Sequence, residues 1–438
     1  MASRMNIPCN GFSVTRGWPL SEVVPRKFRK TSLRRILASE TGIKRPLDGV
    51  RVLELGQIIA GTYGGQMLTD LGAEVIKVEA PVGDLGRLPS VAPYKHLSGL
   101  FLTFNRNKKS IVIDLKTEDG LAVFYDLVKT ADIVVDNFRP GVLAKLNVDY
   151  DDLKVINPRI IQCSVTGFGL EGEYKDLPAL DIIIQSISGL LSITGEKDGP
   201  PARVGIPISD LGGGIFSAQG LLAALYEREK TGVGRRLEVS MFDAMLSLSS
   251  YVGTLWLTNG ELAEPMGTAH EYTVPWEAFE TKEGYLVIAT RQDKFWVKFC
   301  EALNRPDLGE DERFATNQGR VTHRDVLVPM LEEILSARSA ADWLKDMRKF
   351  DVPAAPVNNM KQVFSEPPVA EREMIVEYDH PEVGRVRVPG NPVKLDGVTE
   401  TLSTPAPMLG EHTDAILQSL LNKSDDDIAA LRKSGAVA

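Results

Sequence analysis

Cysteine and histidine are scarce in this sequence. Its 438 residues include only Cys9, Cys163 and Cys300, and its five histidines are scattered. An odd number of distant cysteines argues against a disulfide framework, and the lack of clustered Cys or His ligands argues against a zinc site. We therefore expect a chemistry that needs neither a disulfide nor a metal.

Excess positive charge and long apolar runs are also missing. The net charge of −9 argues against broad electrostatic binding to nucleic acid or to an anionic membrane. No apolar run reaches the roughly 18 residues that a membrane helix needs. Apolar residues make up 43% of the chain and charged residues 25%, as in a globular protein of two or three domains.

Familiar nucleotide and serine motifs are absent as well. No G-x-x-x-x-G-K-[ST] sequence occurs, which excludes a P-loop ATPase, and GIFSAQG lacks the spacing of a serine nucleophile elbow. The turn LELGQIIAGTYGG does not match G-x-G-x-x-G. NAD binding, with Glu79 on a ribose hydroxyl, is therefore only an alternative.

The first forty residues differ from the rest in charge. They contain eight Arg and Lys residues against two Glu, together with several Ser and Thr. A basic, acid-poor leader of this kind predicts a mitochondrial transit peptide over residues 1–40 and a mature protein in the matrix. A disordered basic arm is the alternative.

Residues 41–245 alternate short apolar runs with segments of helical spacing. The runs of strand length are VRVLELG, EVIKVEAP, SIVIDL, ADIVVDNF and RIIQCSVTGFG. This alternation predicts an α/β fold with a large, Rossmann-like, doubly wound domain. A linker helix is expected to end within residues 246–266, a smaller α+β domain to span 267–357, and residues 358–438 to return to the large domain.

The segment GIPISDLGGGIFSAQG, residues 205–220, combines one carboxylate with three consecutive glycines. Asp210 alone fits the N-cap of the following helix. The glycines at 212–214 do not, since each costs about 1 kcal/mol in a helix relative to alanine. Either another backbone packs against this glycine run, or a ligand approaches Asp210 there.

Cations and amides gather at the expected strand ends. Residues 105–109 (NRNKK) precede one strand, Asn137, Phe138 and Arg139 follow another, and Lys145 comes shortly after. As a set they suit a ligand with several phosphates, because anions bind where helix N-termini and cations converge outside strand ends. Phe138 is suited to stack on a purine. For any single cation, a solvated rim is the alternative.

Six separated motifs resemble, in order, the family III CoA-transferases, which include formyl-CoA transferase, carnitine CoA-transferase and α-methylacyl-CoA racemase. They are DGVRVLELGQIIAGTYGGQMLTDLGAEVIKVEAP, FNRNKKSIVIDLKTEDG, DIVVDNFRPGVL, NPRIIQCSVTGFG, DLGGGIFSAQGLLAAL and TPAPMLGEHT, within residues 46–420. The resemblance implies the family fold, an interlocked homodimer, and a CoA thioester as co-substrate without a permanently bound cofactor. It also implies CoA esters and small dicarboxylic acids as the molecules bound.

The resemblance also assigns roles to residues. Asp210, the acid of the D-x-x-x-G motif, is implied to be a nucleophile that forms a mixed anhydride and then an aspartyl-CoA thioester. Gly212 and Gly213 are implied to let the thioester approach and to stabilise its oxyanion through their N–H groups. The implied CoA contacts are Ile58, Ile59, Ala60, Ile113, Lys116, Asn137, Phe138, Arg139 and Lys145, with one contact missing because Ala80 replaces an Arg of formyl-CoA transferase.

For the acids, the resemblance and the basic N-terminus imply succinyl-CoA as donor and glutarate or 3-hydroxy-3-methylglutarate as acceptor. A buried distal carboxylate needs a cation, and we expect Arg106 to supply it. A phosphate contact and a solvated rim are the alternatives for Arg106. His270, with Tyr272 and Trp276, is expected to shape the acyl pocket, and core packing is the other interpretation.

Two departures from the family patterns narrow the function. Racemase members need a histidine in the segment after TGFG, where Leu180 precedes Asp181 here, so two-base proton exchange lacks a partner. The glycine run that covers the formyl-CoA transferase site is replaced by GTAHEYTVPW. We therefore expect a transferase. A CoA-ester racemase and a non-catalytic CoA-ester-binding subunit are the alternatives.

Overall fold

A six-stranded parallel sheet forms the centre of the large domain in the computed structural model, which describes residues 45–396 and 403–438. Its strands are β1 (Arg51–Glu54), β2 (Glu74–Glu79), β5 (Lys109–Val112), β6 (Ile133–Asp136), β7 (Ile161–Thr166) and β8 (Arg236–Ser240). Their order is β5-β2-β1-β6-β7-β8, and every neighbouring pair is parallel. This confirms the predicted Rossmann-like arrangement and places its topological switch point between β1 and β6.

Alternate side chains of the strands bury themselves on opposite faces of the sheet. Leu53 and Ile76 face the core shared with α4 (Glu118–Val128) and α18 (Thr413–Leu421). Val52 and Val75 face the core shared with α8 (Ile208–Thr231), and α2 (Ala60–Asp70) covers the same face. The strands are apolar on both sides because helices cover both faces, as expected for a parallel sheet.

The remaining elements of the large domain are short. They are η2 (Leu85–Arg87), β3 (Pro93–Tyr94), β4 (Leu97–Ser98), α3 (Gly99–Phe104), α5 (Val142–Lys145), α6 (Tyr150–Ile156), α7 (Asp181–Ile187), η3 (Leu190–Ser192), α9 (Met241–Leu248) and α10 (Ser250–Asn259). The apolar segment after β8, where a linker helix was expected to end within residues 246–266, forms two helices, because the chain breaks at Ser250, whose φ is +56°.

Helix α8 begins earlier than expected. Pro207 is its N-cap, so Asp210 lies in the first turn and the glycine run lies inside the helix. With 24 residues and a mean hydropathy of 1.2 over its most apolar window, α8 is long and apolar enough to cross a membrane, unlike any run noted in the sequence. Half of that window is buried against α2, α9 and the sheet, as in the core helix of a globular domain.

The smaller domain has an antiparallel sheet of its own. Its strands β9 (Trp276–Glu280), β10 (Tyr285–Ala289) and β11 (Ala354–Pro356) follow the order β11-β10-β9. The helices are α11 (Asp293–Ala302), α12 (Pro306–Glu310), α13 (Asn317–Thr322), α14 (Arg324–Ser336) and α15 (Ala340–Lys349). Trp296, Phe299 and Leu331 are buried in a core separate from that of the large domain.

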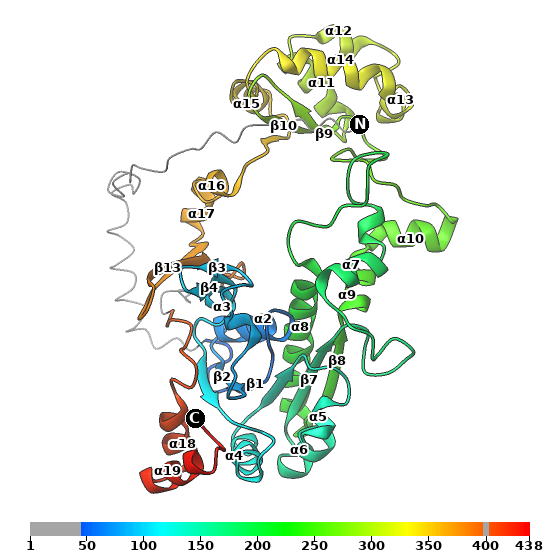
Figure 1. Cartoon of the computed structure of the whole chain (residues 1–438). Coiled ribbons are helices and arrows are strands. Elements are labelled where there is room, and N and C mark those ends of the chain that lie inside the picture. Colours follow the sequence, from blue (N-terminus) through cyan, green and yellow to red (C-terminus); the bar gives the residue numbers. More distant parts are fainter. Residues whose placement is uncertain (1–44, 397–402) are drawn as a thin grey trace, which may run out of the picture.

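The chain then returns to the large domain, as Figure 1 shows. The returning elements are α16 (Met360–Val363), α17 (Pro367–Glu371), β12 (Ile375–His380), β13 (Gly384–Pro389), α18 and α19 (Asp425–Lys433). Residues 404–413 run along the outer edge of β5. There the Gly410 N–H donates to Ser110 Oγ at 2.9 Å, and the His412 N–H donates to Ser110 O at 2.9 Å. The expected transit peptide, residues 1–40, lies outside the described residues.

Candidate active site

Two backbone turns meet at the switch point of the sheet. The turn after β1 contains Gly56, Gln57 and Ile58, and the turn after β6 begins with Asn137. The Gln57 N–H donates to Asn137 Oδ1 at 2.8 Å, and Asn137 Nδ2 donates to Gln57 O at 2.9 Å. Open α/β sheets bind ligands outside the carboxyl ends of their strands at such a point.

Cations lie along the same edge of the sheet. Lys116 follows β5, Arg139 follows β6 and Lys145 ends α5, and all three are exposed. None of them forms an ion pair within residues 45–396 and 403–438, so their charges are available to a ligand. Phe138, half-buried beside Arg139, has its N–H held by Asp136 Oδ1 at 3.0 Å. Of the cations that the sequence indicated before β5, Lys108 and Lys109 are instead paired with Glu54 and Glu74.

Some of the residues expected to contact CoA have side chains that are buried in the protein and inaccessible to a ligand. Ile59 and Ala60 are buried at the start of α2. Ile113 is buried in the core, where its backbone bridges to Val437. These expectations are corrected to backbone contacts at most. Glu79 is buried and hydrogen-bonded to Arg87 and Ser110, so it is not free to hold a ribose hydroxyl.

Asp210 is a partly buried carboxyl in the first turn of α8. Its burial, reinforced by the nearby Asp181 carboxylate, raises the pKa of Asp210 to about 7. Asp181 starts α7 and accepts a hydrogen bond from the Ser209 N–H at 2.9 Å and another from Gln185 Nε2 at 2.6 Å. Asp181 therefore fixes the first turn of the helix that presents Asp210.

Asp181 and Gln57 are candidate site residues that the sequence reasoning missed. Asp181 was noted only because Leu180 precedes it. Its signal was an acidic residue in the first turn of an apolar helix, where a negative charge is favoured. Gln57 is a polar residue in the turn itself, between the strand and the helix, and this position was the signal that could have identified it.

The glycine run has a packing role. A Cβ on Gly212 would lie 2.6 Å from Met245 Cε, and one on Gly214 would lie 2.9 Å from Tyr63 Cβ. Gly213 likewise faces Met241 and Val165. All three glycines are buried inside α8, where N–H groups beyond the first turn serve the helix. The expectation that Gly212 and Gly213 contact substrate is therefore corrected: they let α2 and α9 approach α8 closely.

Arg106 already has a partner within the chain. Both of its Nη atoms bind the Asp70 carboxylate, with Nη2–Oδ2 at 2.7 Å, and only 5% of its side chain is exposed. A guanidinium engaged in this bidentate pair offers no fork to a second carboxylate. The expectation that Arg106 holds the distal carboxylate of the substrate is corrected to a structural ion pair.

His270 belongs to the smaller domain. Its Nδ1 accepts the Tyr272 N–H at 3.1 Å, and its ring lies 5.3 Å from that of Trp276. Within the described residues, no hydrogen bond or ion pair joins His270 to Asp210 or Asp181. The predicted role of His270 in an acyl pocket stays a prediction.

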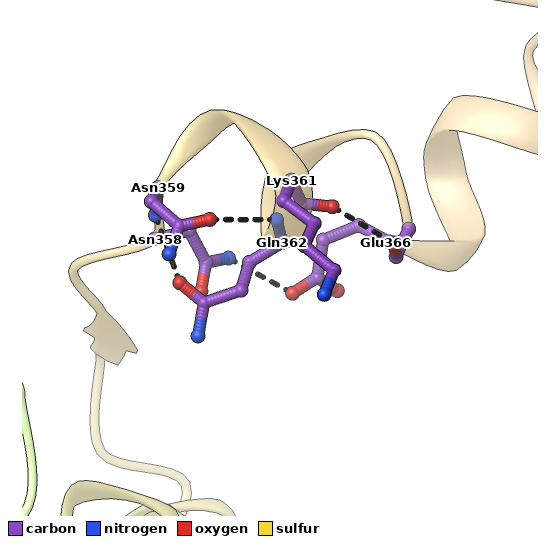
Figure 2. Close-up of a pocket in the computed structure, with 6 residues that line it drawn as sticks. Asn358, Asn359, Lys361, Gln362 and Glu366 are labelled. Atoms are coloured by element: carbon purple, nitrogen blue, oxygen red, sulfur yellow. Dashed lines mark hydrogen bonds between the residues drawn. The ribbon is translucent and has the colours of Figure 1, made fainter. Parts of the chain in front are cut away.

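The surface has another polar hollow, on α16 in the returning segment (Figure 2). Its polar groups bond to one another: Asn359 Oδ1 accepts the Gln362 N–H at 3.0 Å, and Asn358 Nδ2 donates to Glu366 Oε1 at 2.9 Å. The first bond belongs to the N-cap of α16 and the second joins residues on either side of that short helix, so this hollow is not a candidate site. Among the described residues, no group of three or more His, Cys, Asp or Glu side chains is arranged to hold a metal ion.

Comparisons with known proteins agree with this geometry. The family model for CoA-transferase family III matches residues 47–413. Succinyl-CoA:glutarate CoA-transferase of Homo sapiens is 35% identical over 394 residues, covering 90% of this chain and 90% of the relative. Acetyl-CoA:oxalate CoA-transferase of Acetobacter aceti is 39% identical over 377 residues, 85% of this chain and 95% of the relative. A solved CAIB/BAIF family protein from Brucella suis aligns with a TM-score of 0.78 at 36% identity, covering 86% of this chain and 100% of the other.

Proposed function

Because the chain belongs to the family III CoA-transferases, we propose that it moves CoA from succinyl-CoA to a dicarboxylic acid through covalent intermediates on Asp210. Glutarate and 3-hydroxy-3-methylglutarate are the proposed acceptors. The observation that supports the nucleophile is the carboxyl of Asp210 in the first turn of α8, with burial and Asp181 raising its pKa to about 7. A carboxylate of raised pKa is a stronger nucleophile once ionised.

The proposed reaction conserves the thioester. The Asp210 carboxylate attacks the thioester carbonyl of succinyl-CoA, the C–S bond breaks, and CoA leaves as a thiolate from an aspartyl–succinyl anhydride. The thiolate then attacks the aspartyl carbonyl, which gives an aspartyl-CoA thioester and free succinate. The acceptor carboxylate repeats both steps in reverse order and leaves as its CoA ester. Every bond broken is replaced, so no ATP is needed.

The chain's own groups divide this work. Lys116, Arg139 and Lys145 are proposed to hold the phosphates of CoA, and Phe138 its purine. Asp181 keeps the first turn of α8 in place through the Ser209 N–H. The oxyanion is assigned to N–H groups of the first turn of α2, which have no partner within the helix. This replaces the role first expected of Gly212 and Gly213.

A single substitution tests the nucleophile. Asp210→Asn keeps the shape of the side chain and removes the attacking oxygen, so transfer should fall by at least a thousandfold while free CoA still binds. Hydroxylamine added to the wild type with succinyl-CoA should trap Asp210 as a hydroxamate. The matched control is Asp243→Asn, an exposed first-turn carboxylate of α9 that should leave turnover unchanged. Normal turnover in Asp210→Asn would refute the covalent route.

The acids are tested by a panel. Succinyl-CoA and acetyl-CoA are offered as donors, with glutarate, 3-hydroxy-3-methylglutarate and oxalate as acceptors, because the human relative is named for succinyl-CoA and glutarate and the Acetobacter relative for acetyl-CoA and oxalate. We expect the highest kcat/KM for succinyl-CoA with a five- or six-carbon dicarboxylate. A preference for acetyl-CoA and oxalate would overturn the proposed substrates and leave the reaction class intact.

We propose the mitochondrial matrix as the location, on the basic composition of residues 1–40. A fluorescent fusion of the full chain should enter mitochondria, and the same fusion starting at residue 41 should not. Equal distribution of the two fusions would refute this proposal.

A further inference from the structure

The turn after β1 is held in a strained conformation. Ile58 has a φ of +63°, in the left-handed region that β-branched residues strongly disfavour. Such outliers persist only where the surroundings determine them, and they concentrate at ligand-binding sites. Ile58 also lies in one of the two turns at the switch point of the sheet, so the groups that hold it there are of functional interest.

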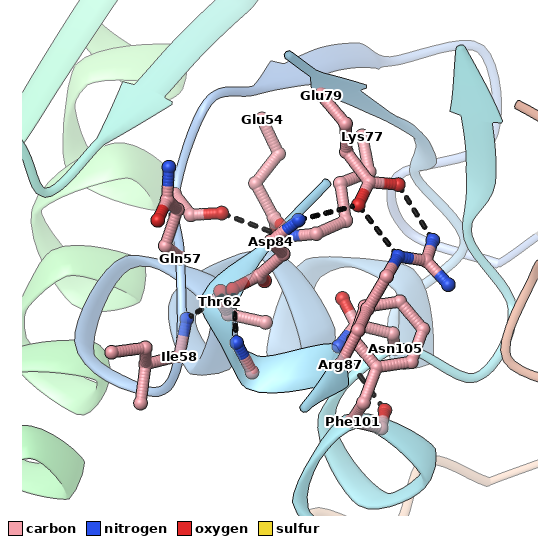
Figure 3. Close-up of polar contacts among 12 residues, drawn as sticks. Glu54, Gln57, Ile58, Thr62, Lys77, Glu79, Asp84, Arg87, Phe101 and Asn105 are labelled. Atoms are coloured by element: carbon pink, nitrogen blue, oxygen red, sulfur yellow. Dashed lines mark hydrogen bonds and ion pairs between the residues drawn. The ribbon is translucent and has the colours of Figure 1, made fainter. Parts of the chain in front are cut away.

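Three side chains hold three successive residues of this turn, and Figure 3 shows two of them, Lys77 and Asp84. Lys77 Nζ donates to Gly56 O at 2.6 Å. Asn137 binds both the N–H and the carbonyl of Gln57. Asp84 Oδ1 accepts the Ile58 N–H at 3.0 Å. The backbone of the turn is thus fixed from the β2 side and the β6 side together.

Lys77 and Asp84 form a buried ion pair beneath the turn. Lys77 Nζ lies 2.8 Å from Asp84 Oδ2, and each side chain is 1% exposed. Burial alone would raise the pKa of Asp84, but the charge and hydrogen bond of Lys77, together with the N–H groups of Gly86 and Ile58, outweigh burial and lower it. Asp84 is anchored further, since it accepts the Gly86 N–H at 2.7 Å and donates its own N–H to Glu79. The pair is therefore charged, fixed and inaccessible to substrate.

We propose that Asp84 and Lys77 are positioning residues that hold residues 56–58 in the CoA-binding conformation before CoA arrives. The inference rests on the proposed function, because it takes the switch-point turns as the CoA site. A turn ordered in advance removes the conformational cost of ordering it on binding, which strengthens affinity without any contact to the ligand. Loss of Asp84 should therefore raise Kd and KM for CoA and its esters, with a smaller effect on kcat.

The test measures free CoA binding by calorimetry on the full chain. Asp84→Ala should weaken CoA binding at least tenfold. In that background, Ile58→Gly should bind CoA more tightly than Ile58→Ala, because both lose the side chain but only glycine adopts a positive φ without strain. The matched control is Asp132→Ala, which breaks an ion pair with Arg228 of 2.9 Å just before β6, at the opposite end of the strands. It should leave CoA affinity unchanged.

The outcomes separate this inference from the proposed function. A wild-type chain that binds no CoA overturns both. If the wild type binds CoA, two results overturn the positioning role alone. One is that Asp84→Ala binds CoA as well as the wild type does. The other is that Ile58→Gly and Ile58→Ala bind CoA equally in the Asp84→Ala background. If Asp84→Ala does not fold, hydrogen exchange of the CoA-free wild type decides. A slowly exchanging Ile58 amide supports a preformed turn, and exchange as fast as in an open loop refutes it.

Discussion

Single residues of this protein show how the surroundings of a carboxyl decide its charge. Asp84 and Glu79 lie beside Lys77 and Arg87, and these cations keep the pKa of each carboxyl low despite burial. Among the described residues, Asp210 and Asp136 form no ion pair, and burial raises the pKa of each to about 7. Buried carboxyls of the same chain therefore differ in protonation near neutral pH. Because the pKa values of Asp210 and Asp136 are raised, measurements across neutral pH report on these two residues.

The rate of transfer should follow the ionisation of Asp210. Only the carboxylate attacks, so kcat/KM for succinyl-CoA should rise with pH through a midpoint of about 7. Asp181→Asn removes the neighbouring negative charge and should move that midpoint to lower pH, while its amide oxygen still accepts the Ser209 N–H. A rate profile that is flat from pH 5.5 to 8.5, or an unmoved midpoint in Asp181→Asn, would contradict this assignment.

The free energy of unfolding should depend on pH through the ionisation of Asp136. Its folded-state pKa lies above that of an unfolded aspartate, so the folded chain keeps a proton that the unfolded chain releases. This carboxyl therefore lowers the free energy of unfolding as pH rises from about 4 to about 7, by several kcal/mol. Asp136→Asn keeps the shape without ionising.

Urea unfolding of wild type and Asp136→Asn, at pH 5 and at pH 8, measures that difference. The gain in stability of Asp136→Asn over the wild type should be larger at pH 8. An equal difference at the two pH values would mean that Asp136 keeps an ordinary pKa in the folded chain.

At the scale of elements, α8 joins packing and chemistry in one helix. Its glycine face lets α2 and α9 approach closely, and its first turn presents Asp210. The glycine run and the carboxyl are neighbours in the sequence because the same turns of α8 are packed tightly on one side and open toward the site on the other. The run thus serves the rigidity of the helix rather than contact with the ligand.

Gly214→Ala should therefore destabilise the fold. Its Cβ would lie 2.9 Å from Tyr63 Cβ and 3.1 Å from Ala60 O, and overpacking of this kind costs about 1–3 kcal/mol. Gly220→Ala, on the same helix, meets only the end of the Leu237 side chain and should be neutral or stabilising. Urea unfolding measures both, and equal effects of the two substitutions would refute the packing role.

The strands were predictable because each is a continuous apolar run between turn residues. A strand that is covered by helices on both faces has such a run. The partners of charged side chains were not. Arg106 and Lys116 look alike in the sequence, yet Arg106 is paired with Asp70, 36 residues away, while Lys116 is exposed. The role of the glycine run stayed open for the same reason, because a sequence does not say which residue faces a missing Cβ.

At the scale of the whole molecule, apolar surface remains uncovered on one part of the large domain. Tyr251, Trp256 and Leu257 on α10 are 55%, 57% and 85% exposed. No residue of α10 is buried. Large exposed apolar side chains gathered on one helix mark an interaction surface. We propose that a second copy of the chain covers it, in the homodimer that the family resemblance implies.

The chain should accordingly behave as a dimer in light scattering at micromolar concentration. Trp256→Glu together with Leu257→Glu should weaken the dimer, and Val155→Glu on α6, where Val155 is 79% exposed, should not.

Two separate connections join the domains, one through α10 and one through α16 and α17 (Figure 1). If the dimer is interlocked through that loop, tagged and untagged dimers should form no mixed dimers until they are unfolded. A monomeric wild type would refute the dimer. Rapid exchange of subunits between tagged and untagged dimers would refute the interlocked arrangement.

The segment along the edge of β5, residues 404–413, affects the order in which the sheet is completed during synthesis. Ser110 receives its hydrogen bonds from Gly410 and His412, some 300 residues later in the chain. While the ribosome makes those residues, β5 displays a row of unpaired N–H and carbonyl groups, the kind of edge on which nascent chains stick to one another. Residues 404–413 thus close the edge of a strand made some 300 residues earlier, and a chain released by a ribosome that stalls before residue 404 keeps that edge open.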